Sequence, residues 1–95
     1  MTSKIEEPEP GERYRHFKGE ERIYEIITVA RDCDNPEKKL VIYRNLYLTG
    51  NLQFGTIWAR SLEDFCGEKI FDKDEEHGGK KYKKGDKVKR FTFIE

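Results

Sequence analysis

IYEIITVA, residues 23–30, is the strongest β-forming segment of this 95-residue chain. It is rich in β-branched residues, whose stiff side chains pack well on a pleated surface. A strict alternation divides the segment into two faces, one with Ile23, Ile27 and Val29 and the other with Tyr24, Ile26, Thr28 and Ala30. Because both faces are largely apolar, we expect a central strand, or one that bends from one sheet into another.

A second strand is predicted at residues 40–47, LVIYRNLY, shortly after the turn signal Asp34-Asn35-Pro36. The connection is short, so the two strands are expected to pair as an antiparallel hairpin. Shorter strands are expected near residues 14–17, 54–60, 70–71 and 91–94.

One short helical turn is predicted at Ser61-Leu62-Glu63-Asp64-Phe65, because Ser61 is a good N-cap and an acidic residue follows three positions later. Short strands, tight turns and one helical turn indicate a mainly β fold. We expect a small SH3-like curled antiparallel sheet or barrel, since closing a short sheet protects its edges and buries its apolar faces.

The length of the chain predicts one small β domain, which we place at residues 13–95. Residues 1–12 are acidic and contain two prolines, so they are expected to form a disordered acidic tail. Residues 72–90 are charged and contain glycines. They predict an exposed excursion, a loose hairpin centred on Gly85-Asp86.

Composition argues against several classes of protein. Lys and Arg together number 19, as do Asp and Glu, so the formal net charge of zero does not favour a strongly basic nucleic-acid-binding domain. No apolar run approaches the roughly 20 residues of a membrane span, and the acidic N-terminus does not resemble a signal peptide. Two cysteines far apart suggest neither a metal site nor a disulfide framework. We predict a cytoplasmic monomer with no membrane partner, metal or cofactor.

Four motifs occur in order along the chain: YRHFKG at residues 14–19, VAR at 29–31, VIYRNLY at 41–47 and WARSLEDF at 58–65. With the phenylalanine strand at Phe91, they resemble the small bacterial family catalogued as domain of unknown function 1653 (DUF1653). The resemblance implies a compact β domain and no particular activity. Two features depart from the family pattern: Ser61 replaces the usual proline, and residues 72–90 look like a longer, more lysine-rich insertion.

Enzyme templates fit the chain poorly. A thiolate–imidazole pair would need His16 beside Cys33 or Cys66, and we favour the interpretation that both cysteines are small apolar fillers or exposed thiols. The sequence has no Gly-x-Ser-x-Gly, P-loop or His-Glu-x-x-His motif. We therefore predict no catalytic residue, with an enzyme acting on a small nucleotide-like substrate as the second alternative.

Arginine recurs beside aromatic residues on the predicted strands. Its planar guanidinium suits carboxylates and phosphates and stacks on rings. If the strand ends converge, they would form a pocket for an anionic or planar ligand. Otherwise each arginine pairs with one of the abundant acidic residues. The candidate ligand-binding residues are Arg15, His16, Arg31, Tyr43, Arg44, Trp58 and Arg60.

The leading prediction is therefore a non-enzymatic binding module for an anionic or planar ligand or a protein partner. His16 fits either a ligand contact or a half-buried histidine bonded to the backbone. The alternative function is binding of RNA or single-stranded nucleic acid, with the strand aromatics as stacking platforms. The basic run Lys80–Arg90 would then contact phosphates, although we favour the interpretation that it is a solvated loop offset by nearby acidic residues.

Overall fold

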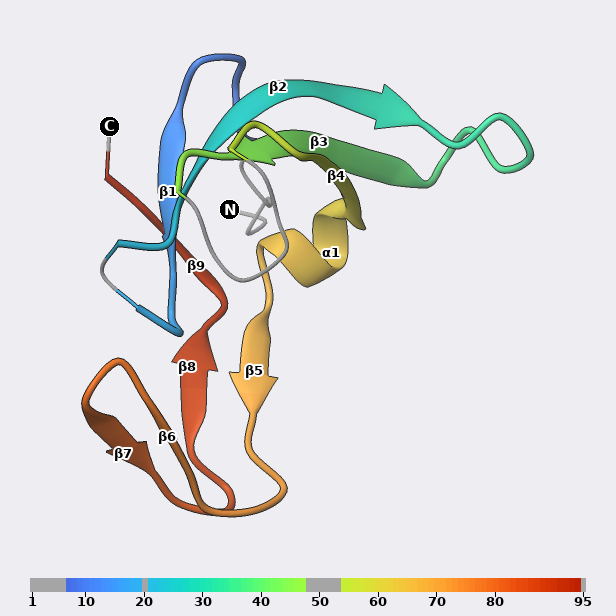
Figure 1. The fold of residues 1–95 in the computed structure, drawn as a ribbon. Coiled ribbons are helices and arrows are strands. Elements are labelled where there is room, and N and C mark those ends of the chain that lie inside the picture. Colours follow the sequence, from blue (N-terminus) through green and yellow to red (C-terminus); the bar gives the residue numbers. More distant parts are fainter. Residues whose placement is uncertain (1–6, 20, 48–53, 95) are drawn as a thin grey trace, which may run out of the picture.

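The computed structural model describes residues 7–19, 21–47 and 54–94. Its main element is a five-stranded antiparallel sheet with the strand order β4-β3-β2-β1-β9. The strands are β1 (Arg13–His16), β2 (Ile23–Arg31), β3 (Lys39–Asn45), β4 (Ile57–Ser61) and β9 (Phe91–Phe93). The sheet curls over the short helix α1 (Leu62–Phe65), as Figure 1 shows. This confirms the predicted mainly β fold, in the form of a curled sheet: among the described strands, β4 and β9 are its two ends, and no barrel closes.

The predicted hairpin between the two strongest strands is present. β2 and β3 pair antiparallel, but their register shifts between Ile26 and Thr28, so that Ile27 is left over as a β-bulge. Val29 then pairs with the buried Val41 and lies on the same face as Ile26. The face assigned to Val29 by strict alternation is therefore wrong, because one extra residue inverts every position beyond it.

The core lies on the concave side of the sheet. Five buried side chains form it: Ile26, Val41, Tyr43, Phe65 and Phe91. The rings of Phe65 and Phe91 stack with centroids 4.2 Å apart. Burying a large apolar side chain contributes about 1.5–3 kcal/mol, so these rings fix α1 and β9 against the sheet.

Helix α1 is too short to be stable alone. The hydroxyl oxygen of Ser61 accepts the backbone N–H of Asp64 at 3.2 Å, which is the predicted N-cap. Phe65 is only 1% exposed, so packing holds the turn in place. No helix among the described residues is long and apolar enough to cross a membrane.

Residues 68–89 form a smaller unit below the sheet in Figure 1, which we call the arm. Within it β5 (Glu68–Ile70) pairs with β8 (Lys87–Lys89), and β6 (Glu75–His77) pairs with β7 (Lys80–Tyr82). The β6–β7 hairpin turns at Gly78-Gly79, both with positive φ, rather than at Gly85-Asp86 as expected. Two adjacent residues with positive φ suit a tight hairpin turn.

The segment before β1 runs beside β2. The Gly11 N–H donates to the Ile26 carbonyl, and the Ile26 N–H donates to the Glu12 carbonyl, each over 2.9 Å. Pro8 is buried. Residues 1–6 of the predicted acidic tail lie outside the described residues, so the tail stays a prediction there.

Candidate functional site

His16 ends β1 and packs its ring among three aromatic side chains. The centroid of its imidazole lies 4.5 Å from that of Phe17, 5.0 Å from Phe91 and 6.3 Å from Tyr24. Its Nδ1 accepts the backbone N–H of Lys18 at 3.2 Å. These contacts make His16 a half-buried histidine with one ring nitrogen already engaged by the backbone.

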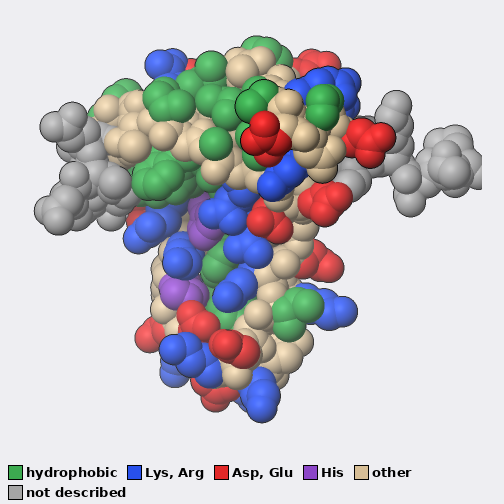
Figure 2. Space-filling model, turned by 90° about the vertical axis from the view of Figure 1, so that its right-hand side faces the viewer, with side chains coloured by type: hydrophobic (Ala, Val, Ile, Leu, Met, Phe, Trp, Pro, Cys, Tyr) green, Lys and Arg blue, Asp and Glu red, His purple; other side chains and the backbone are tan. Residues whose placement is uncertain are grey.

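Four cations act on this imidazole through their charge: Lys18, Arg22, Arg60 and Arg90. Burial first, and then the positive charge of these four side chains, lower the pKa of His16 from 6.5 to about 4. We call the four cations and His16 the basic cluster. Figure 2 shows Lys and Arg side chains gathered around the histidines on the narrower lower part of the molecule. No cation of the cluster forms an ion pair with a described residue.

Aromatic side chains, rather than carboxylates, hold two of these arginines. The Nε–H of Arg60 donates to the Tyr43 hydroxyl at 3.3 Å, and the guanidinium carbon lies 5.7 Å from the Phe91 ring centroid. The guanidinium carbon of Arg22 lies 5.7 Å from the ring centroid of Tyr47. A cation above a ring gains about 0.5–1 kcal/mol at exposed sites, but the ring carries no opposite charge. The positive charge of the cluster therefore stays uncompensated within the described chain.

Arg90 occupies the junction between the sheet and the arm. Its backbone N–H donates to the Gly67 carbonyl, and its carbonyl accepts the Phe17 N–H, each over 3.1 Å. Its side-chain Nε is buried and has no hydrogen-bond partner among the described residues. A buried donor without an acceptor costs about 1–3 kcal/mol, and more when it is charged.

Three of the seven residues predicted from the sequence lie together. His16, Tyr43 and Arg60 all contact the Phe91 ring, with Tyr43 at a centroid distance of 5.7 Å. Trp58 packs at the margin of the same core, and its indole N–H donates to the buried Asn45 side-chain oxygen at 3.3 Å.

The other three predicted arginines lie elsewhere. Arg31, at the end of β2, donates to the Pro36 carbonyl at 2.8 Å. Arg44 forms an ion pair with Glu25, with its Nε 2.9 Å from the Glu25 Oε1. Arg15 is exposed and alternates with His16 on β1, so it points to the opposite face of that strand. The strand arginines are thus spread over several surfaces.

Arg15 lines a shallow groove of about 180 Å³ between β1 and the arm, which we call the arm groove. Lys80 and Lys89 line it as well, next to the half-buried rings of Phe17 and Tyr82. Three cations from distant parts of the sequence therefore meet at this groove.

Lys18, Arg22 and Arg90 were not among the predicted residues. All three lie within or next to segments that the sequence singles out. Lys18 is part of the YRHFKG motif, Arg22 directly precedes the strongest strand, and Arg90 directly precedes the phenylalanine strand. Position at a strand boundary is the signal that could have found them.

Asp32, Cys33 and Asp34 present three possible metal-ligand atoms within 4.8 Å of one another. The Asp32 carboxylate accepts the backbone N–H groups of Asp34 at 2.8 Å and Asn35 at 3.3 Å. An Asp that accepts the N–H two residues on is a common turn device, so the turn itself explains this cluster.

Fold and site define a small antiparallel β domain with a basic cluster beside its core. The family model described as a protein of unknown function, DUF1653, matches residues 12–93. The chain therefore belongs to the DUF1653 family, which confirms the family predicted from its motifs. No curated protein and no solved structure matches the chain.

Proposed function

We propose that this protein is a non-enzymatic binding module whose basic cluster holds a small anionic ligand. One observation carries the proposal: the charges of four cations act on a neutral imidazole, and none of these cations is paired with a carboxylate among the described residues. Like charges gathered in a partly buried site repel one another. A bound anion would offset this repulsion.

The geometry of His16 supports binding rather than catalysis. A general acid or base works best when its pKa lies near the working pH, whereas the pKa of His16 is lowered to about 4. Its Nδ1 is engaged by the Lys18 N–H. Its ring and hydrogen-bond partners among the described residues include neither a thiol nor a carboxylate.

An oxyanion with several acceptor atoms, such as phosphate, fits the donors of the cluster. The guanidinium groups of Arg60 and Arg90 each offer a planar set of N–H groups, which binds such oxygens in pairs. Charge-assisted hydrogen bonds are roughly twice as strong as neutral ones. We therefore expect the ligand to carry a phosphate, sulfate or carboxylate group.

Single-stranded nucleic acid is the second candidate, and the arm groove is the observation that favours it. Arg15, Lys80 and Lys89 line the groove and could follow a phosphate backbone. However, Tyr43 is only 4% exposed and Trp58 is half-buried. Neither of these rings lines the arm groove, so they do not supply the stacking platform that strand binding uses, and a small anion is the better proposal.

An NMR titration at pH 7 tests the proposal, with inorganic phosphate, a nucleoside monophosphate and a short oligonucleotide as probes. The expected result is that amide shifts centre on His16, Arg60 and Arg90 with the small probes. Arg60→Gln and Arg90→Gln should each weaken phosphate binding at least tenfold, since a hydrogen bond to a charged group contributes about 1.5–3 kcal/mol. Arg44→Gln is the matched control and should leave binding unchanged.

Shifts that centre on Lys80, Tyr82 and Lys89 of the arm groove, leave Arg60 and Arg90 unchanged and appear only with the oligonucleotide would favour the nucleic-acid alternative. An equal loss in all three arginine variants would contradict a local site, because it would reflect net charge alone.

A further inference from the structure

A larger cavity, of about 470 Å³, opens beside α1 and β9. We call it the aromatic pocket, because four rings line it: Tyr14, Phe65, Phe91 and Phe93. Its volume lies within the roughly 300–1,000 Å³ of small-molecule sites. No cation of the basic cluster lines this pocket, although the Phe91 ring that His16 and Arg60 contact is part of its wall.

The rings form a rigid apolar wall. Tyr14 meets Phe65 edge to face with centroids 5.1 Å apart and meets Phe93 in the same manner at 5.6 Å. Phe65 is fixed by its stack on Phe91. Phe93 is 52% exposed and lines the pocket, so part of its ring is accessible to a ligand. The wall therefore offers a preformed surface to a flat, apolar body.

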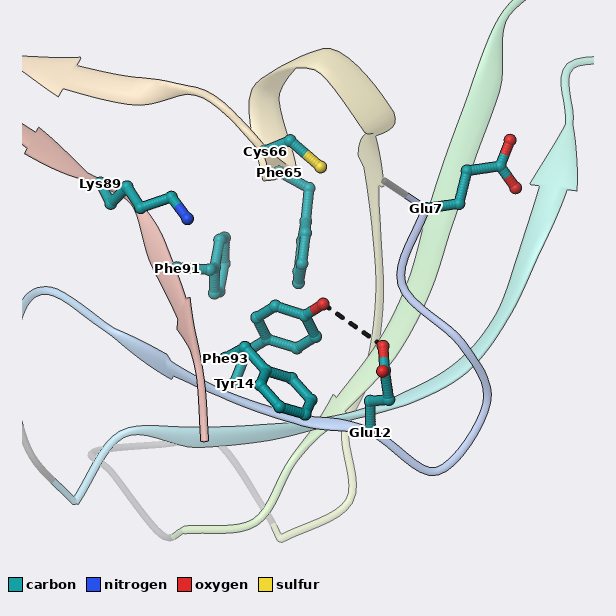
Figure 3. Close-up of a pocket in the computed structure, with 8 residues that line it drawn as sticks. All are labelled: Glu7, Glu12, Tyr14, Phe65, Cys66, Lys89, Phe91 and Phe93. Atoms are coloured by element: carbon teal, nitrogen blue, oxygen red, sulfur yellow. Dashed lines mark hydrogen bonds between the residues drawn. The ribbon is translucent and has the colours of Figure 1, made fainter. Parts of the chain in front are cut away.

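Charges of opposite sign stand on opposite sides of this wall. In Figure 3 the Lys89 ammonium lies to one side of the phenylalanine rings, and the Glu12 carboxylate lies to the other. Glu12 is held in place, because its Oε1 accepts the Tyr14 hydroxyl at 3.3 Å and the Glu9 N–H at 2.7 Å. Lys89 forms no ion pair with a described residue.

The second carboxylate at the pocket, Glu7, forms an ion pair with Lys39 outside it. That pair compensates the charge of Glu7. Among the described residues, the uncompensated charges around the aromatic wall are then one ammonium and one carboxylate, Lys89 and Glu12. A ligand that complements both must itself carry both signs.

We infer that the aromatic pocket binds a small zwitterion with a flat, apolar body between its charged ends. The anionic end faces Lys89, and the cationic end faces Glu12. Aromatic faces and a carboxylate together attract a cation, and complementary charges at both ends fix the orientation of the ligand. The inference stands on residues outside the basic cluster, so it does not depend on the anion site.

Four compounds built on one benzene ring separate the contributions: 4-(aminomethyl)benzoate, benzoate, benzylamine and benzyl alcohol. Calorimetry on the full chain should rank the zwitterion at least tenfold tighter than the other three. Lys89→Gln should bring the zwitterion down to the affinity of benzylamine. Glu12→Gln keeps an oxygen for the Tyr14 hydroxyl, and it should lower the affinity of the zwitterion to the affinity of benzoate.

Cys66 reports where the probe binds, because its thiol lines the pocket. In a Cys33→Ser background, which removes the exposed thiol, saturating zwitterion should slow alkylation of Cys66 at least threefold. Phe93→Ala should abolish this protection. Phe54→Ala, at a phenylalanine that is 60% exposed and lies outside the pocket, is the matched control and should keep it. Circular dichroism is used to check that each variant is folded.

The inference is overturned if benzyl alcohol binds as tightly as the zwitterion, if no probe binds, or if binding leaves the alkylation of Cys66 unchanged. Each of these results leaves the phosphate titration of the basic cluster unaffected.

Discussion

Arg60 donates its Nε–H to the hydroxyl of Tyr43 over 3.3 Å, so the basic cluster is tied directly to the core. Tyr43 is only 4% exposed, and its hydroxyl lies where the apolar core meets the charged cluster. The bond orients one guanidinium without neutralising it, which leaves its positive charge for a ligand.

Tyr43→Phe tests the hydrogen bond between Arg60 and Tyr43. The variant keeps the ring but removes the acceptor of the Arg60 Nε–H, so the free energy of unfolding should fall by about 1 kcal/mol. Urea denaturation measures the loss. In a double-mutant cycle with Arg60→Gln, the two changes should couple by about 0.5–1.5 kcal/mol.

Tyr82→Phe serves as the control for that cycle. The Tyr82 ring stacks on Phe71 with centroids 4.5 Å apart, and its hydroxyl makes no hydrogen bond with a described residue. The control should change stability by less than about 0.5 kcal/mol. Purely additive losses for Tyr43 and Arg60 would show that the bond contributes nothing.

Gly78 fixes how the arm meets β1. Its φ is +58°, and a Cβ there would come within 3.1 Å of the Lys18 carbonyl oxygen and 3.2 Å of the Gly19 Cα. Gly78→Ala should therefore push the β6–β7 hairpin away, in addition to the roughly 1–2 kcal/mol that a left-handed conformation costs a side chain. Hydrogen exchange at the amides of the arm should be faster in the Gly78→Ala variant than in the Gly79→Ala variant.

Gly79 is the matched control, because its φ is +80° but a Cβ there would meet nothing within 4 Å. Gly79→Ala therefore introduces the backbone strain of a left-handed alanine without the close contact that a Cβ at Gly78 makes. Equal exchange rates in the two variants would mean that the contact with the Lys18-Gly19 turn does not position the arm.

Stability should depend on pH through His16. Its pKa is about 4 in the folded chain against 6.5 for the free side chain, so the unfolded chain binds the proton more readily between these values. The contribution of neutral His16 to the free energy of unfolding is complete above about pH 6.5. It falls as the pH drops towards 4 and changes no further below that pH. Because His16 is only half-buried, solvent screening reduces the effect to about 1–2 kcal/mol.

Urea unfolding of the wild type and of His16→Asn between pH 4 and 7.5 measures this contribution by difference. Asn keeps a side-chain acceptor for the Lys18 N–H but does not titrate. Identical pH profiles for the two proteins would exclude His16 as the source of the dependence.

Much of the fold could be predicted because its signals are local. The β-branched residues of 23–30, the turn at Asp34-Asn35-Pro36 and the Ser61 cap each depend on neighbours in the sequence. The bulge at Ile27 could not be predicted, since Ile27 and Thr28 both suit a regular strand equally well. Only the pairing of β2 with β3 reveals the extra residue.

The candidate site was harder to predict, because it depends on non-local pairing. His16 meets Phe91 only because β1 pairs with β9, from the opposite end of the chain. That pairing brings Arg90, which directly precedes β9, to the imidazole, whereas Arg60 comes from β4 at the other end of the curled sheet. Arginine beside aromatic residues was a useful signal for Arg60, but at Arg44 the same pattern marks an ordinary surface ion pair with Glu25.

The most direct test of the anion site is the titration of the His16 imidazole, followed by NMR with and without sulfate, which stays a dianion throughout the range. Without sulfate the pKa should be about 4. Saturating sulfate should raise it by about one unit, since a nearby opposite charge favours the protonated ring. Sodium chloride at matched ionic strength controls for screening. A pKa of His16 that does not move, or that moves equally in chloride, would contradict the site.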